Sequence, residues 1–162
     1  MAQIRVLANL GGSDFRAWSV DFPNAYKTIG LHDSSLEAAT VCFAHPDTNA
    51  PYKARILVQP FGSRRAPANW GRVITFIQFL SMELLALKVG AFADDVYCAE
   101  PNSLAKSGFW APKQSTGPLG LHTSDRKDQP PRKDIVLLGA LIAIGTESFC
   151  ASVRPERIHK IS

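Results

Sequence analysis

The sequence predicts an α+β fold in which a small antiparallel sheet packs on helices. Three features indicate this class: one long apolar run at helical spacing, several short strand-like runs bounded by turn residues, and an ordinary globular composition. Of the 162 residues, 46% are hydrophobic and 20% are charged. This composition supplies a core and excludes a wholly disordered chain, so we expect a single domain over residues 1–162.

The first expected elements are a strand, a short helix and a hairpin. Residues 20–22 (Val-Asp-Phe) read as a strand that enters a short helix near Asn24. Residues 39–43 and 55–59 are strand-like runs joined by HPDTNAPYK, a turn-rich connector. Two such runs around a turn favour a β-hairpin.

A long helix is expected over residues 66–87. Its apolar side chains recur at helical spacing, and Pro67 stands in the first turn, which tolerates a missing N–H. We expect Trp70, Phe76 and Phe79 to lie in the core.

Beyond the helix, residues 88–92 and 96–99 predict two short strands around a polar tip, Ala-Asp-Asp at 93–95. Residues 101–131 contain many glycines and prolines, so we expect no long element there. Residues 135–144 are strand-like, and residues 155–161 favour the start of a helix.

The three cysteines, Cys42, Cys98 and Cys150, form no CxxC pair and stand among apolar neighbours. They predict reduced core thiols, which fit an intracellular protein of the cytoplasm or nucleus. The sequence shows neither a signal peptide nor a run of 18 apolar residues, so we expect no membrane partner.

Positive charge is concentrated in one part of the chain. The net charge is +4, and five basic residues without an acid stand between Asp47 and Glu83: Lys53, Arg55, Arg64, Arg65 and Arg72. This stretch suits contact with phosphate, and it equally suits the solvated face of a slightly basic domain.

Carboxylates are the most informative feature. Asp21 follows a strand, and Asp94 and Asp95 stand at the hairpin tip, each flanked by apolar residues. Ionised carboxylates that converge repel one another unless a cation offsets them, and hard oxygen ligands suit Mg²⁺ or Mn²⁺. An Asp-Asp pair taken alone is also common in solvated turns, so the wider context is needed.

That context is a series of motifs in a fixed order: VDFPNAYKTIGL at 20–31, QPFGSRRAPANWGRV at 59–73, FADDV at 92–96, LGLHTSDRKDQPP at 119–131 and IVLLGALI at 135–142. Together they resemble the successive palm motifs of reverse transcriptases, the RNA-directed DNA polymerases of retrotransposon-type elements. The resemblance covers about residues 15–161. It implies a polymerase palm with part of the fingers and no thumb, and hence a truncated domain.

The resemblance implies a catalytic centre with a two-metal mechanism. Asp21 and Asp94 would hold a pair of Mg²⁺ or Mn²⁺ ions. The backbone carbonyl of Phe22 would complete the coordination shell of one ion, and Asp95 would assist in metal binding nearby. Lys127 matches a lysine near the leaving pyrophosphate that serves as general acid. An exposed lysine in a polar loop is more often simply solvated.

The resemblance also implies contacts to nucleotide and nucleic acid. Tyr26 would lie beneath the incoming sugar and favour deoxynucleotides, although it also suits a core position in its turn. Phe61 would line the nucleotide pocket, and Gly62 lets the backbone approach closely. Arg64 and Arg65 would meet phosphate of template or nucleotide, or lie on the rim.

At the last motif, Gly139 would permit close approach to the backbone of the primer strand. The place of a helix beneath the palm is taken by residues 99–121, where Gly108 and Pro112 predict a degenerate, non-helical segment.

The implied partners are an RNA or DNA template with its primer and deoxynucleoside triphosphates. The implied reaction is template-directed addition of deoxynucleotides to a primer 3′-hydroxyl, with the isolated fragment inactive or active only within a longer product. Two alternatives stay open: a catalytically dead nucleic-acid-binding remnant, and a structural or regulatory domain without a nucleic-acid role.

Overall fold

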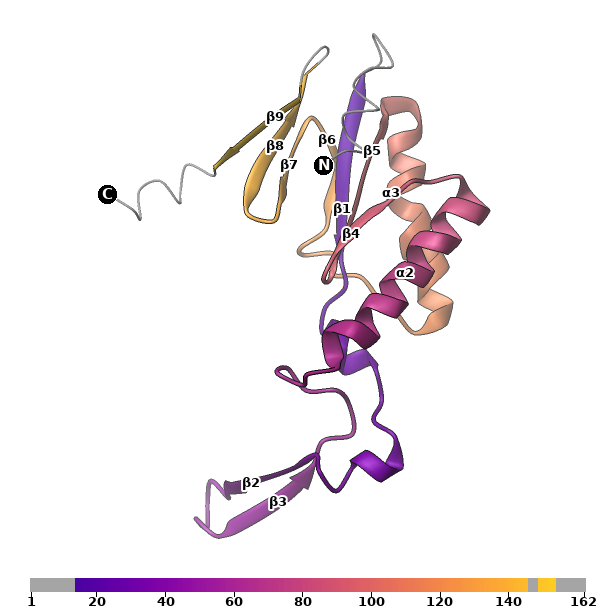
Figure 1. The fold of residues 1–162 in the computed structure, drawn as a ribbon. Helices are drawn as coiled ribbons and strands as arrows, with labels where there is room; N and C mark the ends of the chain where they lie inside the picture. The colour runs from indigo at the N-terminus through magenta and orange to yellow at the C-terminus, as the bar shows by residue number, and fades with distance from the viewer. Residues whose placement is uncertain (1–13, 146–148, 154–162) are drawn as a thin grey trace, which may run out of the picture. The chain divides into compact units, whose positions relative to one another are not determined.

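The computed structural model describes residues 14–145 and 149–153, and the expected helix at 155–161 lies outside them. Contacts divide the chain into two compact units, Met1–Pro23 with Phe76–Ser162, and Asn24–Thr75, which are considered separately below. The expected α+β class is confirmed, since helices accompany antiparallel sheets (Figure 1).

The first unit contains a four-stranded antiparallel sheet in the order β4, β5, β1, β6. These strands are β4 (Gly90–Phe92), β5 (Asp95–Pro101), β1 (Phe15–Asp21) and β6 (Gln129–Arg132). Strand β1 lies in the middle, and every residue from Ala17 to Asp21 is buried. Both faces of β1 are therefore covered, and its C-terminal end brings Asp21 to the end of the sheet.

Helix α3 (Asn102–Thr116) runs beside β1 and β5 (Figure 1), and it corrects the expectation that residues 101–131 hold no long element. Its buried residues recur at intervals of three and four: Ala105, Gly108, Phe109, Pro112 and Thr116. Phe109 meets Trp18 of β1 edge to face, with ring centroids 6.2 Å apart. Packing of this face outweighs the low helix propensity of Gly108 and Pro112.

A second, three-stranded antiparallel sheet consists of β7 (Asp134–Leu137), β8 (Ala140–Ile144) and β9 (Phe149–Val153). Strands β7 and β8 confirm the strand-like character of residues 135–144, with a turn between them at Leu138 and Gly139, both at positive φ. Ile135, Leu137 and Ile142 pack in one buried cluster with Ala17 of β1.

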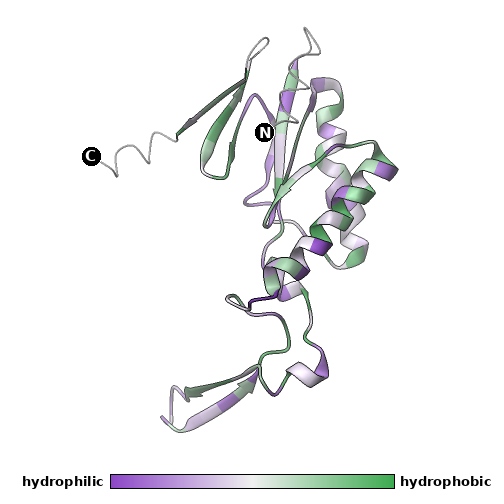
Figure 2. Ribbon diagram, viewed as in Figure 1, coloured by the Kyte–Doolittle hydropathy of each residue, from purple (hydrophilic) through white to green (hydrophobic). Residues whose placement is uncertain are grey.

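The second unit contains the short 3-10 helices η1 (Ala25–Thr28) and η2 (Asp33–Ser35) and the hairpin of β2 (Thr40–Ala44) and β3 (Pro51–Arg55). The hairpin is confirmed, but its second strand begins earlier than residue 55, within the predicted connector. Ile56 N still donates to Ala39 O at 2.8 Å, but Leu57 and Gln59 pair elsewhere, because Leu57 O accepts from Leu31 N and Gln59 N donates to Ile29 O, each at 2.9 Å. Strand β2 is coloured as hydrophobic and β3 as mostly hydrophilic in Figure 2.

Helix α2 (Ala66–Leu85) confirms the long helix and belongs partly to each unit. Trp70 and Ile77 are buried, as the helical period predicts, whereas Phe76 and Phe79 are about half-exposed, so their expected core position is wrong. They lie on the opposite side of the helical period from the buried stripe. Within the described residues, no helix combines the length and apolarity needed to cross a membrane.

The cysteines divide by environment. Cys98 of β5 is buried, and burial raises the pKa of its thiol to about 12. Cys42 and Cys150 are exposed, which corrects the expectation that all three lie in the core. The apolar neighbours of Cys42, Val41 and Phe43, are exposed as well, so an apolar neighbour in sequence does not imply burial.

Candidate functional site at the end of the first sheet

Asp21 is the last residue of β1, and only 6% of its surface is exposed. Its Oδ1 atom is buried and accepts no hydrogen bond from the described residues. The ammonium of Lys127 lies 3.2 Å from Oδ1 and 3.3 Å from Oδ2. A buried carboxylate needs a positive partner, and Lys127 supplies that charge here.

Asp94 and Asp95 reach the same end of the sheet through the hairpin of β4 and β5. Phe92 lies opposite Asp95, so Ala93 and Asp94 form a two-residue turn, with Ala93 in the left-handed region at φ 51°. Asp95 lies directly opposite Asp21 in the pairing of β5 with β1. Cα atoms in such pairs are about 4.5–5.5 Å apart.

The turn is also joined to the residue after Asp21, because Phe22 N donates to Asp94 O at 2.8 Å. The structure therefore brings together four residues that are far apart in the sequence: Asp21, Asp94, Asp95 and Lys127. We call these four residues the carboxylate site.

The electrostatics of the carboxylate site favour a cation. Burial raises the pKa of Asp95 above its ordinary value, and the charges of Asp94 and Asp21 raise it further, while Lys127 acts in the opposite direction. Ionising Asp95 next to two other carboxylates therefore costs free energy, which a bound cation would reduce.

The donor chemistry fits a divalent cation of the Mg²⁺ type. Carboxylate oxygens are its preferred protein ligands, and Asp21 presents a buried oxygen without a hydrogen bond. Within residues 14–145 and 149–153, however, no three His, Cys, Asp or Glu side chains converge closely enough to make a ready metal cluster. The metal-ligand role of Asp21, Asp94 and Asp95 stays a prediction.

Lys127 lies on a loop that is attached to the end of β1. Ser124 N donates to Asp21 O at 2.9 Å, and Asp128 Oδ1 accepts from Asp21 N at the same distance. Asp128 also forms an ion pair with Lys113 of α3. Sequence reasoning missed Asp128 and Lys113, and the one available signal was the acid adjacent to Lys127 in the SDRKD segment.

The predicted nucleotide-binding residues are divided between the two units. Phe22, in the first unit, is buried, and its backbone is the part joined to the site. Within the second unit, Tyr26 and Phe61 meet edge to face with ring centroids 5.4 Å apart. Lys27 Nζ lies 5.7 Å from the Phe61 ring, and Gly62 has φ 86°. The nucleotide-binding role of these residues stays a prediction.

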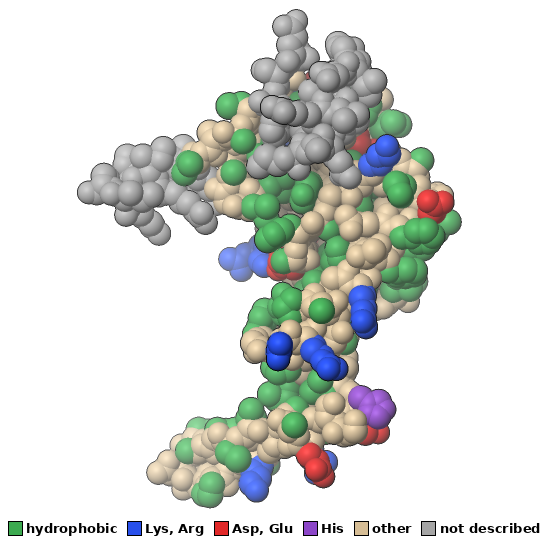
Figure 3. Space-filling model, in the orientation of Figure 1, with side chains coloured by type: hydrophobic (Ala, Val, Ile, Leu, Met, Phe, Trp, Pro, Cys, Tyr) green, Lys and Arg blue, Asp and Glu red, His purple; other side chains and the backbone are tan. Residues whose placement is uncertain are grey.

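Of the predicted nucleic-acid contacts, Arg64 and Arg65 are exposed and Gly139 is partly buried. Arg64 and Arg65 precede α2 in the second unit, and Lys53, Arg55 and Arg72 of the same unit are exposed too. Figure 3 shows Lys and Arg side chains on the surface of this unit. Gly139 occupies the turn between β7 and β8 at φ 80°, a conformation that glycine adopts readily.

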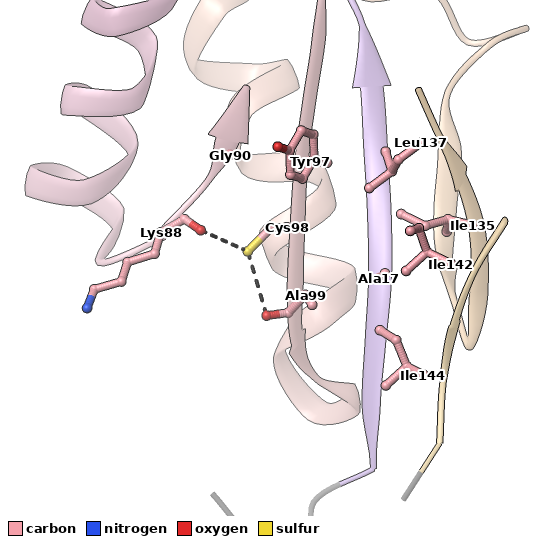
Figure 4. A pocket seen from close by; sticks show the side chains of 10 residues that line it. All are labelled: Ala17, Lys88, Gly90, Tyr97, Cys98, Ala99, Ile135, Leu137, Ile142 and Ile144. Carbon is pink, nitrogen blue, oxygen red and sulfur yellow. Dashed lines mark hydrogen bonds between the residues drawn. The ribbon is translucent and has the colours of Figure 1, made fainter. Parts of the chain in front are cut away.

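An apolar pocket lies between the two sheets of the first unit (Figure 4). Its lining includes Ala17, Ile135 and Ile142, and Cys98 Sγ donates to Lys88 O at 3.4 Å beside it. The lining side chains offer no convergent set of acids, bases or cations. This pocket therefore belongs to the packing of the two sheets.

The first sheet, with α2 and α3 and the second sheet beside it, has the fold of part of a reverse transcriptase. A solved structure of the foamy viral protease-reverse transcriptase in complex with an RNA/DNA hybrid matches 90% of this chain with a TM-score of 0.68 and 17% sequence identity. The chain spans 18% of that solved chain. No family model and no curated protein matches the sequence.

Proposed function

We propose that this chain is the catalytic palm portion of an RNA-directed DNA polymerase, which adds deoxynucleotides to a primer 3′-hydroxyl under the direction of a template. The observation that carries the proposal is that Asp21, Asp94 and Asp95 lie at one end of the same sheet, with the ammonium of Lys127 3.2 Å from the Asp21 carboxylate. The likeness of the fold to part of a reverse transcriptase supports the proposal.

The three carboxylates would hold Mg²⁺ or Mn²⁺, which when bound supplies Lewis-acid stabilisation of charge on phosphoryl oxygens. Asp21 is held by two backbone hydrogen bonds to residues of the Lys127 loop, so its carboxylate is oriented before substrate binds. The 3′-hydroxyl of a primer would lose its proton to water as its oxygen forms a bond to the α-phosphorus of the nucleotide, and the bond from that phosphorus to the pyrophosphate oxygen would break.

Lys127 would act at the leaving group. Its side chain is 60% exposed, so the ammonium reaches solvent and substrate as well as Asp21. It would donate a proton to a pyrophosphate oxygen and balance the negative charge that develops there. Tyr26 would exclude a 2′-hydroxyl and so favour deoxynucleotides over ribonucleotides.

Primer extension tests this function directly. The chain is incubated with a primed RNA or DNA template, deoxynucleoside triphosphates and either Mg²⁺ or Mn²⁺, and incorporation is followed on a gel. We expect incorporation that Asp21→Asn and Asp94→Asn each reduce by about a hundredfold or more, because each removes charge stabilisation of several kcal/mol. The control Asp134→Asn alters an exposed acid of the same unit and should retain incorporation.

A second candidate is a nucleic-acid-binding remnant without catalysis. The exposed basic residues of the second unit favour it, since cations at a surface bind phosphate in a salt-dependent way. Binding to a primer-template duplex that falls steeply with salt, without incorporation in either metal, would select this candidate. Absence of binding at low salt would exclude both candidates and favour a structural or regulatory role.

A further inference from the structure

The loop that carries Lys127 is tied to the core by a carboxylate that uses both of its oxygens. The Asp128 side chain is 3% exposed. Its Oδ1 accepts the hydrogen bond from Asp21 N at 2.9 Å, and its Oδ2 forms the ion pair with Lys113 Nζ. Asp128 therefore connects α3 directly to the backbone of the residue whose carboxylate faces Lys127.

The surroundings of Lys113 stabilise the charged form of its side chain. Its side chain is 10% exposed, and Nζ lies 5.1 Å from the ring centroids of both Phe109 and Trp110. Burial lowers the pKa of Lys113, but the neighbouring carboxylates of Asp125 and Asp128 outweigh burial and leave the pKa raised. The buried charge of Asp128 is thus matched by a buried cation.

Backbone hydrogen bonds place Lys127 between two anchored points. Lys127 N and Asp128 N both donate to Ser124 O at 2.8 Å, and Ser124 N donates to Asp21 O. On the other side, Gln129 begins β6 and its Nε2 donates to Ser19 Oγ at 2.9 Å. The Lys127 side chain itself is long and largely exposed, so the location of its ammonium depends on this backbone.

We propose that Asp128 and Lys113 are positioning residues, whose ion pair holds residues 124–128 on the backbone of Asp21 and so keeps the Lys127 ammonium on the Asp21 carboxylate. We call this ion pair the latch. The consequence of the latch for catalysis rests on the proposed function, whereas the latch itself rests on the contacts of Asp128 and Lys113.

The latch predicts a change in Mn²⁺ affinity that differs from the change expected if Asp128 and Lys113 acted only through their charges. While Lys127 stays on Asp21, it competes with a divalent cation for the same carboxylate. Opening the latch frees Lys127, so Asp128→Asn and Lys113→Met should both tighten Mn²⁺ binding. If the two residues acted through charge alone, losing an acid would weaken binding and losing a cation would strengthen it, in opposite directions.

Mn²⁺ titration of the whole chain by electron paramagnetic resonance measures this difference. We expect the Kd to fall about three- to tenfold in Asp128→Asn, Lys113→Met and Lys127→Gln, which is the size of coupling typical of groups in one network. Combining either latch variant with Lys127→Gln should give no further fall. Lys113→Arg keeps the cation and should restore a Kd close to that of the unaltered chain.

Asp125→Asn is the matched control. Asp125 also bonds to Lys113, at 2.6 Å, but its side chain is 90% exposed and the end of β1 is bonded to Asp128 instead. We expect the Kd of Asp125→Asn to stay within about twofold of the unaltered chain, as for an exposed pair. Opposite shifts in Asp128→Asn and Lys113→Met would overturn the latch.

Hydrogen exchange separates failure of the latch from failure of the proposed function. If Mn²⁺ fails to bind, or if binding survives Asp21→Asn, the proposed metal site is wrong. The latch is then judged by exchange of the Asp21 and Lys127 amides, which should be faster in Lys113→Met and Asp128→Ala than in Asp125→Asn. Unchanged exchange in Lys113→Met, whether or not the Asp128 variants fold, would overturn the latch.

Discussion

At the scale of single residues, Glu100 shows how burial sets a pKa away from the carboxylate site. Its Oε2 accepts a hydrogen bond from Trp18 Nε1 at 3.0 Å. Burial raises the pKa of Glu100 above its ordinary value, and the bond from Trp18 offsets only part of that effect. The charged form of Glu100 is therefore a cost to the folded protein at neutral pH.

The sign of this effect gives a prediction for Glu100→Gln. A raised pKa in the folded state means that the stabilising contribution is complete in acid and is lost as pH rises through the folded pKa. Glutamine keeps an acceptor for Trp18 without the charge, so it should raise the Tm at pH 7 and leave it nearly unchanged at pH 4. Thermal melts at both pH values measure this, and a lower Tm at pH 7 would contradict it.

Some residues of the carboxylate site and its surroundings can be identified from the sequence, and others cannot. Asp21, Asp94 and Asp95 stand out in the sequence because each polar residue interrupts an apolar strand end. Lys113 and Asp128 carry no such mark, because they belong to a helix and a loop whose approach depends on packing. Their pairing over this distance in sequence is a property of the fold.

At the scale of secondary-structure elements, α3 forms where local propensity opposes it. Gly108 lies against β5, and a Cβ at this position would lie 2.6 Å from Cδ of Glu100 and still closer to its carboxylate oxygen. An added Cβ would therefore displace the Glu100 carboxylate, which accepts the hydrogen bond from Trp18 Nε1, so glycine at this position leaves room for that carboxylate.

We predict that Gly108→Ala destabilises the protein by about 1–3 kcal/mol, because displacing the Glu100 carboxylate leaves the buried N–H of Trp18 unpaired, and this cost outweighs the gain in helix propensity. The matched control is Gly117→Ala at the end of α3, where an added Cβ has no heavy atom within 4 Å. The control should be neutral or slightly stabilising. Urea unfolding of both variants measures the difference, and equal stability of the two would contradict the packing account.

At the scale of the whole molecule, the two units differ in how their strands are covered. In the first unit, Trp18, Val20 and Val96 are fully buried within the sheet. In the second unit, all of β2 and most of β3 are exposed, apart from the half-buried Ala54. A two-stranded hairpin exposed in this way gains little from burial and is marginally stable in water.

This contrast predicts a hierarchy of local opening. Amides of β2 and β3 should exchange with deuterium faster than those of β1 and β5, by about two orders of magnitude or more, because opening the hairpin exposes little apolar surface. Hydrogen exchange with peptide-level mass spectrometry measures it. If nucleic acid covers the second unit, the hairpin amides should slow when a primer-template duplex is added, while equal exchange in both units would contradict the hierarchy.

Much of the local structure could be read from the chain. The run around Trp70 and Ile77 predicted α2, and the polar tip at Asp94 predicted the hairpin of β4 and β5, since periodicity and turn residues act over a few neighbours. Helix α3, the exposure of Phe76 and the start of β3 could not be predicted, because each depends on which surface another segment covers.

The strand-like runs and the long helical run were sufficient, without coordinates, to predict an α+β fold, and the resemblance of the ordered motifs to those of reverse transcriptases selected Asp21, Asp94, Asp95 and Lys127 as one chemical group. Tertiary packing decided the rest: that Asp95 lies opposite Asp21, that Lys127 reaches the Asp21 carboxylate, and that Lys113 and Asp128 hold the loop there. The physical reason is the sequence separation over which the interactions act. Strand and helix signals arise between neighbours, whereas the approach of charges far apart in the chain requires the whole core to form.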